Sequence, residues 1–145
     1  MRHISIDQLR RVAAVPRAKP LTRRERLARW AKLLNREPQR LLTTLVGTEY
    51  ATKENRDTIR AANSPFSIAF DDPLLRAIGL KDDTYGEAKR FFELSDRQLH
   101  NIVCACHFGG GVPAALVARH VRSAERSSAF SENVLKLCKW LVGRE

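Results

Sequence analysis

The residues best suited to chemistry are two histidines and two cysteines that lie close together, at His100, Cys104, Cys106 and His107. A helix turns by about 100° per residue, so His100, Cys104 and His107 fall within about 60° of one another on a helical segment. Imidazole and thiolate are preferred zinc ligands, but a complete site needs a fourth, for which Cys138 is the remaining cysteine. The paired Cys-x2-Cys spacing of many zinc sites is absent. A buried structural cysteine beside surface histidines is the favoured interpretation of this cluster, and a small metal or thiol site is the alternative.

Positive charge is concentrated in the first quarter of the chain. The chain carries a formal net charge of +10, and residues 1–40 alone hold 12 Lys or Arg against 3 acids. Clustered cations attract phosphate backbones or acidic proteins with salt-sensitive affinity. The candidate binding residues here are Arg10, Arg11, Arg17, Lys19, Arg23, Arg24, Arg26, Arg29, Lys32 and Arg36. Trp30 lies among them and is suited to base stacking, but its apolar neighbours favour core packing. For the basic segment as a whole, the alternative is a solvated face without a ligand.

A second basic face follows the glycine run at 109–111. Arg119, Arg122 and Arg126 repeat at helical spacing in the segment after Pro113. A helix, a break and a basic helix could form a helix-turn-helix, whose second helix offers polar side chains to base edges. Apolar residues fill positions 114–117, so an ordinary pair of helices joined by a glycine hinge is favoured. A P-loop is not indicated, because no strand precedes the glycines and no Gly-Lys-Ser/Thr follows.

Catalytic constellations are sparse. The acid pairs Asp71-Asp72 and Asp82-Asp83 are adjacent in sequence, and such neighbours do not face each other as an acid and base must. Both pairs lie at predicted helix starts, where carboxylates favour the helix dipole. No Ser/His/Asp arrangement with recognisable local context is present. We therefore favour a non-enzymatic protein without a cofactor.

The elements that must position these residues are helices with clear start signals. Four capping boxes begin at Ser5, Thr22, Thr84 and Ser95, each with Glu or Gln three residues later. They predict helices over 5–15, from Thr22 onward, from Thr84 onward, and from Ser95 to about residue 107. The second of these places its apolar residues on one stripe, at Leu27, Trp30, Ala31 and Leu34.

Proline and glycine mark the remaining helix boundaries. Pro38 and Pro113 fit first helical positions, with helices ending near Gly47 and Arg126. Ser64-Pro65 and Asp72-Pro73 are cap-plus-proline pairs. Residues 66–70 alternate like a strand, yet a lone strand leaves its backbone groups unpaired, so a short helix or turn is favoured. Weaker signals predict a polar helix from Thr52 and a last helix from Ser128 to Gly143.

Composition and start signals together predict an all-α fold, a compact orthogonal multi-helix domain of about eight short helices. We expect residues 1–20 to form a basic N-terminal helix or arm and residues 21–145 a single helical domain. The chain is 43% hydrophobic and 29% charged, as globular domains are. Three cysteines, no apolar leader and no apolar run of membrane-spanning length favour a cytoplasmic protein without disulfides or a membrane span.

Two stretches resemble small uncharacterised bacterial helical proteins. They run from Asn63-Ser64-Pro65 to Arg76, and from Leu94-Ser95 through His100 to Cys104-Ala105-Cys106-His107. The similarity covers about half the chain, between Leu27 and Val121. No function is known for such proteins, so the resemblance implies a bacterial cytoplasmic setting and no site residues.

The leading functional hypothesis is a non-enzymatic basic binding or regulatory protein that engages nucleic acid or an acidic partner through its N-terminal segment. One alternative is a helical adaptor that binds another protein in an apolar groove. Another is the metal or thiol site at His100, Cys104 and His107. The sequence does not address oligomeric state.

Overall fold

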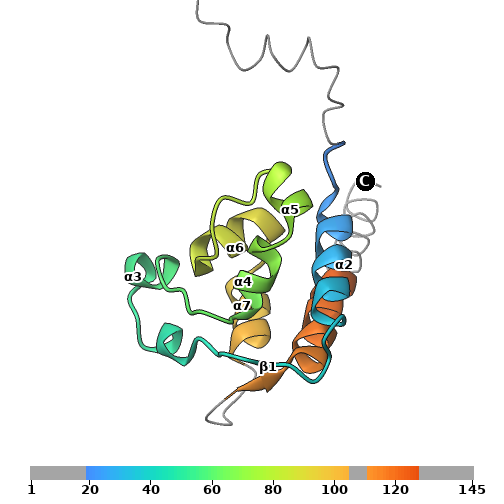
Figure 1. Ribbon diagram of the computed structural model, residues 1–145. Coiled ribbons are helices and arrows are strands. Elements are labelled where there is room, and N and C mark those ends of the chain that lie inside the picture. The colour runs from blue at the N-terminus through green and yellow to red at the C-terminus, as the bar shows by residue number, and fades with distance from the viewer. Residues whose placement is uncertain (1–18, 105–110, 128–145) are drawn as a thin grey trace, which may run out of the picture.

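The computed structural model describes residues 19–104 and 111–127. Over these residues the chain is mostly helical with one small two-stranded sheet, which confirms the all-α class (Figure 1). The helices predicted over 5–15 and from Ser128, and most of the glycine run, lie outside the described residues. The count of about eight helices, their orthogonal packing and the division at residue 20 stay predictions.

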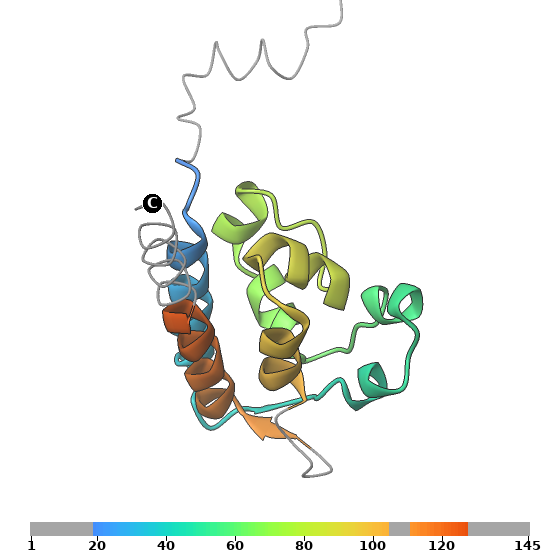
Figure 2. The ribbon, with the colours of Figure 1, turned by 180° about the vertical axis from the view of Figure 1, so that it is seen from behind.

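Two longer helices lie side by side and antiparallel, and the shorter helices pack against them from one side (Figures 1 and 2). The longer pair is α2 (Arg23–Leu34) and the helix at 114–127. The other elements, in chain order, are β1 (Leu41–Leu42), η1 (Val46–Glu49), α3 (Lys53–Asp57), α4 (Pro65–Phe70), α5 (Pro73–Ala77), α6 (Tyr85–Phe92), α7 (Asp96–Val103) and β2 (Val112–Pro113).

The capping boxes set the helix starts where the structure describes them. The Thr22 and Ser95 side chains accept from the backbone N–H three residues on, and the Glu25 and Gln98 side chains accept from the cap N–H groups in return. At Thr84 only half the box forms, because the Glu87 carboxylate instead accepts from the Lys81 N–H and pairs with Arg90. Three of the four predicted starts are therefore confirmed, and the box at Ser5 is outside the described residues.

Two of the four helices predicted to start with proline begin at the proline itself. Ser64 and Asp72 cap α4 and α5, with Pro65 and Pro73 at the first helical positions. The alternating residues 66–70 are helical, as expected from the cap-plus-proline pair. Gly79, with φ of +114°, ends the α5 segment in a conformation that favours glycine.

The helix predicted from Pro38 to Gly47 is wrong, whereas the helix predicted from Pro113 to about Arg126 is present and begins one residue later, at 114. Residues 35–39 form turns, Leu41–Leu42 is a strand, and it pairs antiparallel with Val112–Pro113. The helix at 114–127 begins after this strand, and its first N–H groups, of Ala114 and Ala115, donate to the Arg40 and Pro38 carbonyls at 2.9 and 3.0 Å. A partner 70 to 72 residues away in sequence thus overrides the local helix signals of residues 38–47.

An aromatic cluster joins α2 to the shorter helices. Trp30 is fully buried and stacks on Phe92 at 4.4 Å between ring centroids, with Phe66 6.0 Å away. Its indole N–H donates to the Pro65 carbonyl at 3.0 Å, which satisfies the buried donor. Trp30 is therefore a core residue, as its apolar neighbours predicted, and is unavailable for base stacking.

Gly86 allows α3 to lie directly against α6. A Cβ atom at this position would lie 2.7 Å from Asp57 Cβ and 2.9 Å from the Asp57 carbonyl oxygen. We predict that Gly86→Ala lowers the free energy of unfolding by about 1–3 kcal/mol, because the backbone of α3 must move. Urea denaturation measures the effect. Gly47→Ala is the matched control, since a Cβ there meets nothing within 4 Å, and an equal loss in both variants would contradict the prediction.

Candidate nucleic-acid interface

The structure describes seven of the ten basic residues predicted as binding residues in the N-terminal segment. Arg10, Arg11 and Arg17 lie outside the described residues. The other seven lie on α2 or beside its ends, at Lys19, Arg23, Arg24, Arg26, Arg29, Lys32 and Arg36. Their positive charge is partly compensated by acids from distant parts of the chain.

Three arginines of α2 form ion pairs. Arg29 makes a bidentate bridge to Asp72, with N–O distances of 2.9 and 2.7 Å. Arg24 pairs with Glu125 at 3.0 Å, and Arg26 pairs with Glu93. These three ion pairs partly neutralise the positive charge of α2, although the Arg24 side chain stays 80% exposed.

Arg23 and Arg26 also make contacts that are not ion pairs. Arg23 Nε donates to the Glu93 carbonyl at 3.0 Å. The Arg26 guanidinium lies over the Phe91 ring, 5.0 Å from its centroid, where a cation–π contact adds to the ion pair. Lys19, Lys32 and Arg36 are exposed and make no ion pair within the described part of the chain. The basic residues of α2 thus divide into a tethered group and a solvated group.

The second basic face is presented by the helix at 114–127. Its buried positions are Ala114, Val117, Ala118, Val121 and Ala124, at the spacing of one helical stripe. Because these positions pack inward, the residues on the far side of the helix face solvent. Those are Arg119, Arg122 and Arg126, all exposed, which we call the arginine stripe.

On the exposed face of this helix, no acidic side chain neutralises the positive charge of the arginine stripe. The one acid among residues 114–127 is Glu125, and it is engaged by Arg24. Positions 119, 122 and 126 lie within about 60° of one another around the helix axis. The Arg126 Nε donates at 3.4 Å to the Arg122 carbonyl of the same helix. The stripe therefore combines three guanidinium groups on a rigid element, without an acid partner among the described residues.

A polar groove runs beside this helix, between it and the start of α7. It is open, with a volume of about 710 Å³. The side chains that line it include hydrogen-bond donors suited to phosphate or base edges, at Arg23, Arg97, Gln98, Asn101, His120 and Ser123. Glu93 is the one acid in its lining, and it pairs with Arg26. Arg97, Gln98 and Asn101 were not predicted as site residues, because only the packing of α7 beside the helix at 114–127 brings them into one groove.

His120 sits in the wall of this groove in neutral form near pH 7. Burial lowers its pKa, and the neighbouring Arg119 lowers it further. A neutral imidazole can donate from one ring nitrogen and accept at the other. Its contribution to the groove is therefore a hydrogen bond and not a charge.

The helix-turn-helix hypothesis stays a prediction. α7 ends at Val103, and the basic helix begins after the strand at Val112–Pro113, with residues 105–110 between them outside the described part. The apolar residues at 114–117 include two that are buried, Ala114 and Val117. This half of the helix packs on the body, so the exposed arginines of its second half are the groups available to a ligand.

The metal hypothesis gains no cluster from the described residues. Cys104 is buried, with its sulfur 3.3 Å from Thr48 Oγ1 and 3.6 Å from the Leu45 carbonyl, whereas His100 is exposed. No group of three or more His, Cys, Asp or Glu suited to a metal ion occurs within the described ranges. Cys106, His107 and Cys138 lie outside them.

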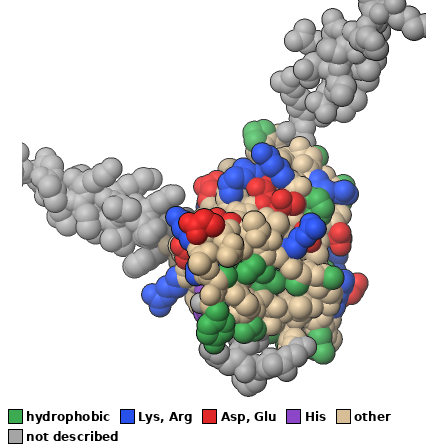
Figure 3. All heavy atoms as spheres, turned by 90° about the vertical axis from the view of Figure 1, so that its left-hand side faces the viewer, with side chains coloured by type: hydrophobic (Ala, Val, Ile, Leu, Met, Phe, Trp, Pro, Cys, Tyr) green, Lys and Arg blue, Asp and Glu red, His purple; other side chains and the backbone are tan. Residues whose placement is uncertain are grey.

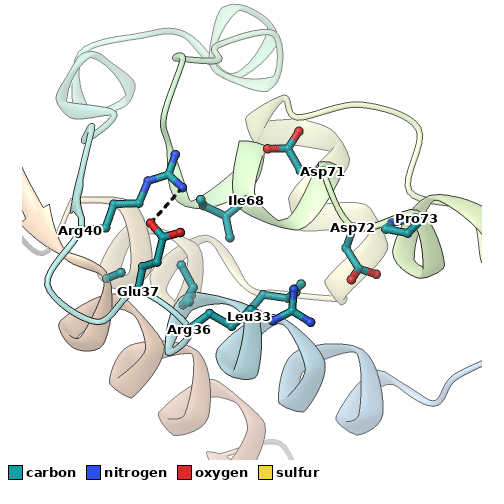
Figure 4. Close-up of a pocket in the computed structure, with 10 residues that line it drawn as sticks. Leu33, Arg36, Glu37, Arg40, Ile68, Asp71, Asp72 and Pro73 are labelled. Carbon is teal, nitrogen blue, oxygen red and sulfur yellow. Dashed lines mark ion pairs between the residues drawn. The ribbon is translucent and has the colours of Figure 1, made fainter.

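A smaller pocket between α2, β1 and α4–α5 is lined by two arginines and three acids. It encloses about 210 Å³, and Arg40 on its rim pairs with Glu37 at 3.6 Å (Figure 4). The carboxylates of Asp71 and Asp72 point in different directions, as expected for neighbours in sequence. Asp72 is occupied by Arg29, so these two acids do not form an acid–base pair.

Basic and acidic side chains are interspersed on the α3 side of the molecule, where hydrophobic side chains gather lower on the same face (Figure 3). No helix in the described residues is both long and apolar enough to cross a bilayer.

No protein-family model, no curated protein and no solved structure matches this chain.

Proposed function

We propose that this chain is a non-enzymatic, cytoplasmic binding protein whose ligand is a polyanion, with nucleic acid as the favoured class. The observation that supports this most is the arginine stripe, three exposed guanidinium groups on one helix face with no acid partner among the described residues. Guanidinium binds phosphate through two parallel hydrogen bonds, and this geometry makes arginine the preferred phosphate ligand in proteins.

The polar groove extends the proposed interface. Arg97 adds a fourth guanidinium, and the amides of Gln98 and Asn101 are suited to phosphate, sugar or base edges. The stripe spans about 10 Å along its helix, enough to meet more than one phosphate of a duplex. The proposal also keeps a basic N-terminal segment as a second contact with the polyanion. Because several arginines of α2 are tethered by acids, the cations proposed for this contact are Arg10, Arg11, Arg17, Lys19, Lys32 and Arg36.

Fluorescence polarisation with labelled DNA and RNA tests the proposal. We expect binding at about 50 mM salt that weakens steeply at about 200 mM, since binding releases counterions from the phosphate backbone. Absence of binding to either nucleic acid at the lower salt would remove this form of the proposal. Binding to polyglutamate but not to nucleic acid would point instead to an acidic protein partner.

The adaptor alternative is supported by exposed apolar side chains beside η1. Val46 is 43% exposed and Tyr50 is 87% exposed. Large apolar side chains at this exposure are candidates for a protein contact. A partner whose capture is lost with Tyr50→Ser, and kept when the arginine stripe is changed, would favour the adaptor over the polyanion-binding protein.

A further inference from the structure

Another hollow, separate from the polar groove and the smaller pocket, lies between η1, α3 and the start of α6 and α7. It is open, with a volume of about 500 Å³. Six side chains line it, at Thr48, Arg56, Tyr85, Asp96, Arg97 and His100. The lining thus holds four groups that can donate hydrogen bonds, namely two guanidinium groups, an imidazole and a phenol, and one carboxylate. Its residues lie up to 52 positions apart in the sequence.

Arg56 is held in place, and part of its donor capacity is unused. Its Nη2 donates to the Ala51 carbonyl at 3.2 Å, which anchors the guanidinium at the base of α3. Its Nε is buried and has no hydrogen-bond partner among the described residues. A buried donor of this kind is destabilising unless a ligand or water satisfies it. Gly86 contributes to this placement, because it lets α3 lie against α6 beside Tyr85.

The carboxylate in the lining is compensated by cations around it. Lys89 Nζ lies 2.5 Å from Asp96 Oδ1. This hydrogen bond is the main cause of a lowered Asp96 pKa, with further lowering by the charges of Lys89, Arg56 and Lys53. Asp96 is therefore ionised and already paired. Positive charge dominates the surroundings of the hollow.

The phenol in the lining is a donor. Burial and then the negative charge of Asp96 raise the pKa of Tyr85, and they outweigh the lowering by the charge of Arg56 and by the hydrogen bond between Arg56 and the phenol. Tyr85 thus keeps its proton near neutral pH and can donate it in a hydrogen bond. Thr48 is different, because its hydroxyl lies 2.7 Å from the Leu45 carbonyl and donates there.

We infer that this hollow binds a phosphate group, carried by a small phosphate monoester or by the end of an oligonucleotide. Arg56, Arg97 and Tyr85 approach from three different elements, and a phosphate offers three acceptor oxygens in different directions. A carboxylate offers two oxygens in one plane and would leave part of this donor set unmet. The phosphate site does not depend on the proposed polyanion interface, although Arg97 lines both.

Titration of the full chain with inorganic phosphate, followed by NMR and calorimetry, tests the site. We expect binding with a dissociation constant of about 1 mM or tighter. Arg56→Gln should weaken it about tenfold or more, and Tyr85→Phe, which keeps the ring and the core packing, by a smaller factor. The matched control is Arg60→Gln, a nearby exposed arginine that pairs with Asp83. Its binding should equal that of the wild type.

The outcomes separate this inference from the proposed function. Phosphate binding that survives replacement of the arginine stripe, and is lost with Arg56→Gln, supports the site even if no nucleic acid binds. Tighter binding of a 5′-phosphorylated oligonucleotide than of its unphosphorylated form identifies an oligonucleotide end as the source. Equal binding of the two excludes that source and leaves a small phosphate monoester. No phosphate binding by the wild type up to about 10 mM, or equal loss with Arg56→Gln and Arg60→Gln, overturns the inference.

Discussion

Replacing Asp72 with alanine is expected to lower the free energy of unfolding by about 3 kcal/mol. The Asp72 side chain is only 3% exposed and makes two sets of interactions. It accepts two hydrogen bonds from Arg29, and it caps α5 by accepting from the Leu74 and Leu75 N–H groups. Removing the buried partner of this part-buried pair leaves the Arg29 charge uncompensated, and the lost cap adds about 1 kcal/mol. Urea denaturation measures the change.

Asp71→Ala is the matched control. Asp71 is the exposed neighbour and takes no part in the cap or the bridge, so its replacement should change stability by less than about 0.5 kcal/mol. Equal effects at the two positions would show that the bridge from α2 to α5 does not stabilise the fold.

The same carboxylate predicts how stability depends on acid. Burial alone would raise the Asp72 pKa, but the hydrogen bonds from Arg29, Leu75 and Leu74 outweigh it and the pKa is lowered. Between the folded pKa and the unfolded value near 3.9, the unfolded chain binds more protons. The stabilisation is therefore complete above about pH 5 and is lost as the pH falls through the folded pKa. Asp72→Asn should flatten this part of the curve; an unchanged acid dependence would contradict the assignment.

Replacing Arg119, Arg122 and Arg126 together with glutamine is expected to weaken nucleic-acid binding about tenfold or more at about 50 mM salt. Each phosphate contact contributes about 0.9 to the slope of log affinity against log salt for duplex DNA. Loss of three contacts should therefore reduce the slope by about 2.7. Because all three side chains are exposed and make no ion pair in the described residues, the fold should be unaffected.

The control for this variant removes the same charge elsewhere. The control variant combines Arg60→Gln, Arg76→Gln and Lys81→Gln. All three residues are exposed, and none belongs to the helix at 114–127 or lines the polar groove. We expect this triple variant to bind nearly as tightly as the wild type, with only the small loss that a lower net charge causes. Equal weakening in both variants would mean that net charge, and not the arginine stripe, determines binding.

Local signals were sufficient to predict most helix starts. A cap is a contact between residues two or three positions apart, so Thr22, Ser64, Asp72 and Ser95 could be identified from sequence. The apolar spacing around Trp30 also predicted its burial correctly. These features depend on neighbours along the chain and require no knowledge of the fold.

Contacts between distant segments were not predictable in this way. The strand at Leu41–Leu42 forms because Val112–Pro113 lies beside it, and nothing in residues 38–47 indicates this partner. The concentration of charge in the first quarter was real, but its partners Asp72, Glu93 and Glu125 lie 43 to 101 residues away from their arginines. Ion pairs between residues so far apart in sequence depend on tertiary packing. They therefore determine which of the predicted cations are available to a ligand.

Arginine footprinting of the full chain tests the central claim most directly. Phenylglyoxal modification followed by mass spectrometry reports each guanidinium separately, with and without saturating nucleic acid. We expect Arg119, Arg122 and Arg126 to be protected, and Arg60 and Arg76 to stay reactive. Undiminished reactivity along the 114–127 helix in the saturated complex, or protection confined to residues 1–18, would contradict the account.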